Sequence, residues 1–249
     1  MSALLYCGFF MLITILLSLA CYRMFSRWWM HRRVINNEFT GILFGAVSLI
    51  QSLLIAFVIV AVWEDYEELN QTIEEEADKL NSIIAHTVTL PDSLRTELRT
   101  EVGRYCIKVI DEWQKPEEAR IDQASAIPAI RLLLLEIQPQ DNQQEKILNV
   151  VDEDLNKISD LRRARLSHLR SHVPALVWII LLTGSIMVIG FSFFIHTESA
   201  GLKQIGISFL TGIIAMSIFM VYTLDKPFTG KLIIGNEPYH KVLMLLKES

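Results

Sequence analysis

The stretch Trp63-Glu64-Asp65-Tyr66-Glu67-Glu68-Leu69 marks the point at which an apolar helix passes into a charged one. Before it, residues 41–63 contain no Asp, Glu, Lys or Arg. After it, apolar side chains recur at three- and four-residue steps, which is the stripe of an amphipathic helix; they are Tyr66, Leu69, Ile73, Ala77, Leu80 and Ile84. Neither Gly nor Pro separates the two parts. The pattern predicts one helix from Gly41 to about Thr89, about 70 Å long.

Four apolar runs are long enough to cross a bilayer, whose core requires about 20 residues of helix. They are residues 3–22, 41–63, 173–195 and 205–224. The first run lacks a preceding Lys or Arg, so we interpret it as an uncleaved membrane helix and not as a signal peptide. The predicted fold class is all-α: an integral membrane protein with four transmembrane helices and a helical soluble domain inserted between the second and third. Its parts are residues 1–63, 64–172, 173–224 and 225–249.

The inserted block is acidic. Residues 64–172 carry 14 Lys and Arg against 23 Asp and Glu, a net charge of −9, while the whole chain has −5. No basic face is long enough to follow a phosphate backbone, which excludes nucleic acid as a partner. Further helices are expected around residues 94–113, between the prolines at 116 and 139, and from about residue 141 past Ile158. Whether the last of these continues into the third span is open, because Pro174 lies near the start of that span.

The second span carries a stripe of small residues, in which Gly41-x-x-x-Gly45 has the spacing that lets helices approach closely. The simplest interpretation of such a stripe is helix packing alone. Gln51 lies beside the stripe, and an amide at this depth requires a partner helix or water. The absence of charged residues from this span argues against a proton relay and is compatible with a passive pore gated by apolar side chains.

Other chemistry is weakly indicated. His168 and His172 have a spacing that can bind zinc, but no third ligand is evident, so we predict no metal site and no cofactor. Cys7, Cys21 and Cys106 have neither disulfide nor metal spacing and are expected to be buried apolar side chains. No nucleophile–base pair, phosphate loop or dinucleotide fingerprint is present, so an enzyme is the least expected class. The arginines at 162, 163 and 165 are expected near lipid headgroups, bound to phosphate or paired with acidic residues between 64 and 78.

Several short motifs along the chain resemble those of the bestrophin-like membrane family, which is distantly similar to the bestrophin anion channels. They are Ala56-Phe57-Val58-Ile59-Val60-Ala61-Val62-Trp63, Glu76-Ala77, Tyr105 with Glu112-Trp113, Arg162 with Arg165-Leu166, and Asp225-Lys226-Pro227-Phe228-Thr229-Gly230. The similarity to bestrophins proper rests on the W-x-x-Y-E-x-L junction formed by Trp63, Tyr66, Glu67 and Leu69, and on Pro227-Phe228 before Gly230.

The resemblance implies a homo-oligomeric channel, a tetramer or pentamer, in the cell membrane with its soluble domain in the cytosol. Bestrophins line a narrow neck with apolar residues four apart, which corresponds here to Gly45, Leu49 and Leu53. Together with the small stripe, this gives Gly45, Leu49, Ser52, Leu53 and Ala56 as the expected pore-lining or gate residues. Bestrophins follow their Pro-Phe-Gly with acidic residues that clasp calcium. Here Lys231-Leu232-Ile233-Ile234 follows Gly230, so calcium gating is not expected.

We therefore expect a multi-pass, bestrophin-like ion channel that conducts inorganic ions. The resemblance implies a preference for anions, as in a chloride channel. The acidic block would add a negative field to any vestibule that it lines, so ion selectivity stays open. Positive charge does not settle orientation, because four arginines lie between residues 23 and 33 and four lysines follow residue 224. The alternative function is a non-conducting membrane scaffold or stress sensor that binds a partner through the acidic domain.

Overall fold

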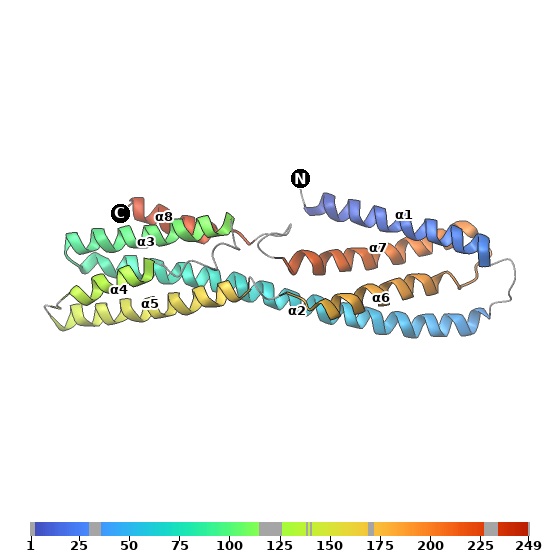
Figure 1. The fold of residues 1–249 in the computed structure, drawn as a ribbon, viewed down its shortest axis with the longest axis horizontal. Coiled ribbons are helices and arrows are strands. Elements are labelled where there is room, and N and C mark those ends of the chain that lie inside the picture. Colours follow the sequence, from blue (N-terminus) through green and yellow to red (C-terminus); the bar gives the residue numbers. More distant parts are fainter. Residues whose placement is uncertain are drawn as a thin grey trace. The chain divides into compact units, whose positions relative to one another are not determined.

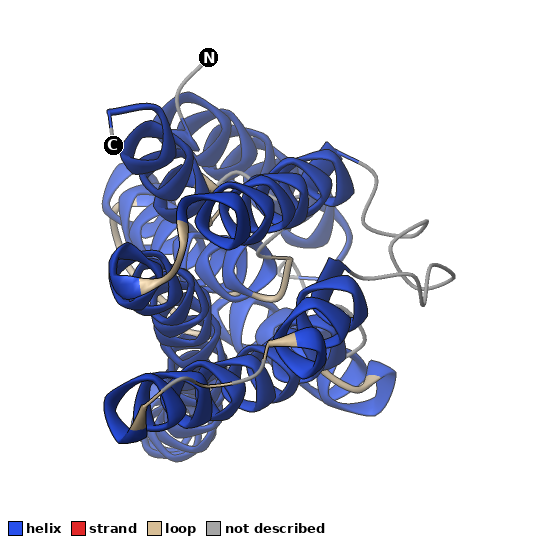
Figure 2. Cartoon of the chain, turned by 90° about the vertical axis from the view of Figure 1, so that its left-hand side faces the viewer, coloured by secondary structure: helices blue, strands red, loops and turns tan. Residues whose placement is uncertain are grey.

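A computed structural model describes residues 3–29, 36–114, 126–137, 139, 141–168, 172–226 and 234–248. Every regular element in these ranges is a helix (Figure 2). In chain order they are α1 (Ala3–Trp29), α2 (Asn37–His86), η1 (Thr87–Thr89), α3 (Asp92–Gln114), α4 (Ala126–Glu136), α5 (Asn142–His168), α6 (Ala175–Ser192), α7 (Ala200–Leu224) and α8 (Glu237–Glu248). They form two compact units. Residues 1–64 and 173–233 make the membrane unit, and residues 65–172 and 234–249 make the helical unit.

Each of the four expected apolar runs corresponds to a helix long and apolar enough to cross a membrane; these helices are α1, α2, α6 and α7. The third is shorter than expected, since α6 covers Ala175–Ser192 of the run 173–195. The long second helix is also present, since α2 ends at His86 and the 3-10 turn η1 follows it. At its start, Asn36 Oδ1 accepts hydrogen bonds from the backbone N–H groups of Glu38 and Phe39 at 3.1 and 3.3 Å. This side chain satisfies donors that the first helical turn leaves without partners.

In the membrane unit, α1 packs along α7, and α7 packs against α6 (Figure 1). Tyr22, Phe193 and Ile207 form a buried cluster, with the rings of Tyr22 and Phe193 5.6 Å apart. Lys203 is buried beside this cluster, and its Nζ donates to the carbonyl oxygens of Phe193 and Ile195. The lysine therefore satisfies carbonyl groups just beyond the C-terminal end of α6, where no further helical turn can bond them.

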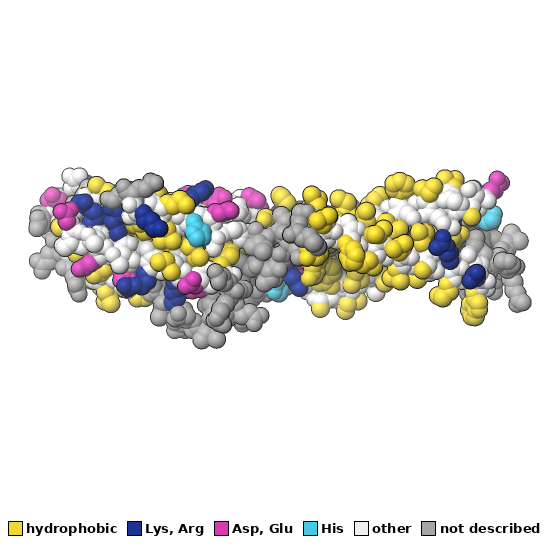
Figure 3. All heavy atoms as spheres, turned by 90° about the horizontal axis from the view of Figure 1, so that it is seen from above, with side chains coloured by type: hydrophobic (Ala, Val, Ile, Leu, Met, Phe, Trp, Pro, Cys, Tyr) yellow, Lys and Arg dark blue, Asp and Glu magenta, His cyan; other side chains and the backbone are white. Residues whose placement is uncertain are grey.

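In the helical unit, α3 packs against α4 and α8, and α4 packs against α5 (Figure 1). The face of this unit drawn in Figure 3 carries Lys, Arg, Asp and Glu side chains, whereas hydrophobic side chains dominate the drawn face of the membrane unit. Ion pairs fasten α2 to α5; in one of them, Lys79 Nζ lies 2.9 Å from Asp154 Oδ1. The unit is therefore held by polar contacts as well as by apolar burial.

The helix that was expected from about residue 141 does not continue into the third span. α5 ends at His168, residues 172–174 are not helical, and α6 begins at Ala175 with Pro174 as its N-cap. A proline suits this place because it has no N–H to leave without a partner and cannot extend a preceding helix. His168 lies on α5 and His172 lies in the non-helical segment, so the two do not share a helical face at the zinc-binding spacing.

Candidate functional site

The five expected pore-lining residues lie on one stretch of α2 and are all exposed within the chain; they are Gly45, Leu49, Ser52, Leu53 and Ala56. The two leucines show how open this face is, because Leu49 is 68% and Leu53 is 56% exposed. Large apolar side chains that are this exposed on a membrane helix must face lipid, another copy of the chain or a pore. This outward face of α2 is the first candidate functional surface.

The two glycines of the small-residue stripe of α2 make no close helix contact among the described residues. A Cβ placed on Gly41 or on Gly45 would meet no heavy atom within 4 Å. The close approach that the Gly41-x-x-x-Gly45 spacing permits is therefore not used by the described residues.

The opposite side of α2 is fastened to α6. Gln51 is only 5% exposed, and its Nε2 donates to the Leu181 carbonyl oxygen at 3.0 Å and to Ser185 Oγ at 3.2 Å. Ile55 and Val62 continue the buried side along α2. The amide therefore has the partner helix that its place in the span demands.

A pocket of about 420 Å³ lies between α2, α6 and α7. Its wall mixes polar and apolar groups; they include Gly45, Ser48, Leu49, Gln51, Ser52, Leu210 and Ser217. Ser48 Oγ is buried there and makes no hydrogen bond within the described part of the chain. Three of the expected pore-lining positions thus border a space that is partly polar.

The residues of the W-x-x-Y-E-x-L junction lie within α2, whereas Asp225 of the other expected motif lies at the end of α7. Trp63 is 49% exposed, Leu69 is fully buried, and Tyr66 and Glu67 lie between these extremes, all within α2. Asp225 caps α7 at its C-terminal end, and its Oδ1 accepts the backbone N–H of Val173 at 2.6 Å. This bond ties the end of the last span to the chain just before the third.

The other expected motif residues of that segment, Pro227, Phe228 and Gly230, lie outside the described residues.

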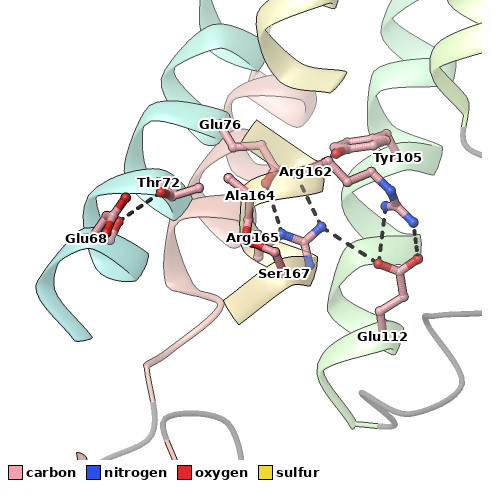
Figure 4. A network of polar contacts seen from close by, with 9 residues as sticks. All are labelled: Glu68, Thr72, Glu76, Tyr105, Glu112, Arg162, Ala164, Arg165 and Ser167. Carbon is pink, nitrogen blue, oxygen red and sulfur yellow. Dashed lines mark hydrogen bonds and ion pairs between the residues drawn. The ribbon is translucent and has the colours of Figure 1, made fainter. Parts of the chain in front are cut away.

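The remaining motif residues converge in the helical unit on one buried cluster of charges (Figure 4). Arg165 of α5 donates from Nε to Glu76 Oε2 of α2 at 2.9 Å, with the side chains 3% and 0% exposed. Tyr105 of α3 donates its hydroxyl proton to Glu76 Oε1. Two acceptor oxygens of one carboxylate are therefore used by two different helices, which fixes α2 against α3 and α5.

Arg162 and Glu112 form the second half of the cluster. The guanidinium of Arg162 meets the Glu112 carboxylate with both of its terminal nitrogens, at 2.6 and 3.2 Å (Figure 4). Each side chain is 8% exposed. Arg165 Nη2 lies 3.8 Å from Glu112 Oε2 and so connects the two halves. Such a bidentate pair has the geometry in which an arginine and a carboxylate bind most strongly.

Aromatic rings close the cluster. The Arg165 guanidinium carbon lies 5.3 Å from the ring centre of Trp113 and 5.9 Å from that of Tyr239 on α8. Trp113 Nε1 also donates to the Ile234 carbonyl oxygen at 2.9 Å. The cluster therefore holds α8 as well as α2, α3 and α5, and cations over ring faces add to its stability.

The environment shifts the ionisation of several members. Burial and the neighbouring charge of Glu76 raise the pKa of Tyr105 and that of Tyr239 well above the usual value for tyrosine. The same two causes raise the pKa of the Cys106 thiol to about 12. Burial lowers the pKa of Arg165, but the interactions with Glu76, Tyr239 and Tyr105 together outweigh burial and raise that pKa. Both tyrosines and the cysteine are thus neutral, and the arginine is charged, at physiological pH.

Of the two alternatives expected for the arginines, binding to lipid phosphate does not apply to Arg162 and Arg165, because both are buried in pairs with carboxylates. For Arg162 neither alternative is met, since its partner Glu112 lies outside the acidic run. Pairing with the acidic run between 64 and 78 is confirmed for Arg165, whose partner is Glu76. Arg163 is 78% exposed and lies 3.6 Å from Asp160.

The cluster itself was not predicted, although the sequence contains a signal for it. Glu76 lies seven residues after Leu69 and three after Ile73, on the apolar stripe of its helix. Arg162 and Arg165 lie four and seven residues after Ile158, again on an apolar stripe. A charge at a core position must find an opposite charge, so charges on these two apolar stripes indicate a buried network.

The comparisons with known proteins agree with one family. The sequence matches the bestrophin-like domain over residues 8–239. No curated protein matches the chain. A crystal structure of a bacterial bestrophin homologue from Klebsiella pneumoniae superposes with a TM-score of 0.76 at 11% identity, covering 96% of this chain and 97% of that one. A second structure from that organism gives a TM-score of 0.70 at 12% identity, covering 100% of this chain and 98% of the other.

A third crystal structure, described only as a membrane protein, gives a TM-score of 0.76 at 9% identity and covers 96% of this chain and 97% of its own. At such low identities these structures establish the fold alone. The domain match nevertheless covers most of the sequence, and it includes the residues of the buried cluster and of the outward face of α2. On these grounds the chain belongs to the bestrophin-like family.

Proposed function

We propose that the protein is an ion channel of the bestrophin type, in which several copies assemble around a pore lined by the outward face of α2. The family and the fold support a channel, and the proposed cargo is inorganic anions such as chloride. The proposed assembly is a homotetramer or homopentamer in the cell membrane. Its four apolar helices cross the bilayer, and the helical unit, inserted between the second and third crossings, lies in the cytosol.

The observation that carries the proposal is the exposure of Leu49 and Leu53 on α2. They are four residues apart and therefore lie one above the other along the helix. The chain fastens α2 from the other side through Gln51 and leaves these leucines uncovered. Around the axis of an oligomer, each leucine position would contribute one apolar ring. A narrow apolar ring expels water, and this blocks ions until the ring widens.

The experiment is ion flux into liposomes that contain the purified full-length protein. Leu53→Ser replaces an apolar ring by a hydroxyl ring, so basal flux should rise by on the order of tenfold, equivalent to a barrier lowered by about 1.4 kcal/mol. The matched control is Ile186→Ser, because Ile186 on α6 is 69% exposed and belongs to another helix. It should leave the flux unchanged.

Chloride and gluconate gradients, followed by sodium gradients, test the proposed anion preference in the same liposomes. A wild type that conducts with equal flux in both variants would refute the gate. If neither the wild type nor Leu53→Ser conducts, the channel proposal fails.

A second function, a scaffold that binds a partner through the helical unit, is favoured by one separate observation. Among the described residues of this unit, five large apolar side chains are between 55% and 77% exposed; they are Val88, Ile107, Leu132, Leu135 and Met244. Such side chains suit a protein interface. Silent liposomes, together with an assembly that lacks an axial path, would support the scaffold over the channel.

A further inference from the structure

We propose that Gln51 is a positioning residue, whose amide sets the rotation of α2 about its own axis and so decides which side chains form the outward face. The inference rests on the proposed function, since it concerns the helix that is proposed to line the pore. It gives a role to the Gln51 amide, which is not among the proposed pore-lining residues.

The hydrogen bonds between Gln51 and α6 are directional. The two Nε2 hydrogens of Gln51 go to separate acceptors on α6, the Leu181 carbonyl oxygen and Ser185 Oγ. Ser185 Oγ in turn donates to the same carbonyl oxygen at 2.7 Å. Gln51 and Ser185 are 5% and 3% exposed, so water does not compete for these bonds.

Gly184 leaves the space that the Gln51 amide occupies against α6. A Cβ at position 184 would collide with the Gln51 side chain and would lie 2.7 Å from its Cδ. No other residue type therefore fits under this amide without displacing it. Gly190, six residues further along the same helix, has no heavy atom within 4 Å of an added Cβ among the described residues.

Hydrophobicity cannot set the rotation of α2. Lipid tails are as apolar as the leucine, isoleucine, valine and phenylalanine side chains of residues 42–62, so no face of this helix is preferred inward on that ground alone. A hydrogen bond from a single amide to one point on α6 does distinguish the faces. Gln51 therefore supplies directional information that the apolar surface lacks.

The geometry connects this anchor to the gate positions. At 100° per residue, Leu49 and Leu53 each lie about 160° around the helix from Gln51. An anchor almost diametrically opposite the two leucines holds them pointing away from α6. Without it, rotation by one residue position would replace them on the outward face by Ile50 and Leu54.

The test measures helix rotation directly, in the full-length protein with its three cysteines replaced. Nitroxide spin labels are placed one at a time at positions 46–50 and 52–57. Accessibility to oxygen and to a water-soluble nickel chelate then gives a profile whose angular phase reports the orientation of α2. Gln51→Met keeps the length of the side chain and removes both hydrogen bonds, and Gly184→Ala pushes the amide out of its seat.

Both variants should shift the phase by at least about half of the 100° step between neighbouring residues, and Gly190→Ala should leave it unchanged. Ser185→Ala removes one of the two acceptors and keeps the apolar contacts, so it should give a smaller shift in the same direction. It also provides a reading if the larger changes prevent folding. An unchanged phase in all the folded variants overturns the proposal, because an ordinary packing contact would alter stability and leave the orientation as it was.

Flux measured on the same variants separates this inference from the proposed function. A phase shift in a protein that never conducts supports the positioning role while the channel fails. Conduction with an unchanged phase overturns the positioning role alone.

Discussion

Replacing Arg165 by methionine tests whether the buried cluster stabilises the helical unit. The change leaves Glu76 fully buried without its closest cation, which lies at 2.9 Å in the native protein, and removes the cation that faces Trp113 and Tyr239. Breaking a buried pair by removing one partner costs about 3–5 kcal/mol, because a charge is left in a medium that cannot solvate it. We expect a destabilisation of this size.

Arg163 provides the matched control on the same helix. It is 78% exposed, and its partner Asp160 is 70% exposed at 3.6 Å. A surface pair of this kind contributes about 0–1 kcal/mol. Arg163→Met should therefore be nearly neutral, although it removes the same side chain two residues away.

Hydrogen–deuterium exchange of the full-length protein in detergent gives the measurement. The slowest amides of α3 and α5 report the opening of the helical unit. In Arg165→Met they should exchange on the order of a hundred- to several-thousand-fold faster, since about 1.4 kcal/mol corresponds to tenfold in an opening equilibrium. Adding Glu76→Gln removes the orphaned charge and should recover part of the loss. Equal exchange in the Arg165 and Arg163 variants would refute the reasoning.

Three further outcomes are expected. The Cys106 thiol has an ordinary pKa of 9.0 in the unfolded chain and a pKa of about 12 in the folded protein. Its contribution to the free energy of unfolding is therefore present below about pH 9 and is lost as the pH rises toward 12. In denaturant titrations, the free energy of unfolding should fall less between about pH 8 and about pH 11 in Cys106→Ala than in the wild type. Lys203→Met should destabilise the membrane unit by about 1–3 kcal/mol through the carbonyl groups of Phe193 and Ile195 that it orphans, and thermal unfolding in detergent measures this against the exposed Lys241→Met. A cysteine at Ser93 should react with an impermeant maleimide only after cells are opened, and labelling of intact cells would contradict a cytosolic helical unit.

The helices were predictable where one local rule governs them. No Gly or Pro interrupts the stripe beyond Trp63, and α2 accordingly runs to His86. Pro174 raised the question of a break before the third span, and the structure has one there. These features depend on neighbours within a few residues, which is the range over which backbone sterics and capping act.

The contacts that position the site depend on residues far apart in the chain. Gln51 required a partner, but nothing near it indicates that Gly184 and Leu181 provide its place on α6. Glu76 and Arg165 are 89 residues apart and meet only because three helices pack together. Periodicity could place these charges on apolar stripes, but pairing them requires the tertiary arrangement that the helices adopt.

The internal neutrality of the buried cluster has a consequence for how this protein can diversify. Two arginines and two glutamates cancel inside it, so the net charge of −9 over residues 64–172 is borne by residues outside the cluster. The groups that hold the helical unit together are therefore distinct from those that generate its long-range field. Surface substitutions can weaken, remove or reverse that field, and with it the attraction or repulsion of nearby ions, without disturbing the architecture.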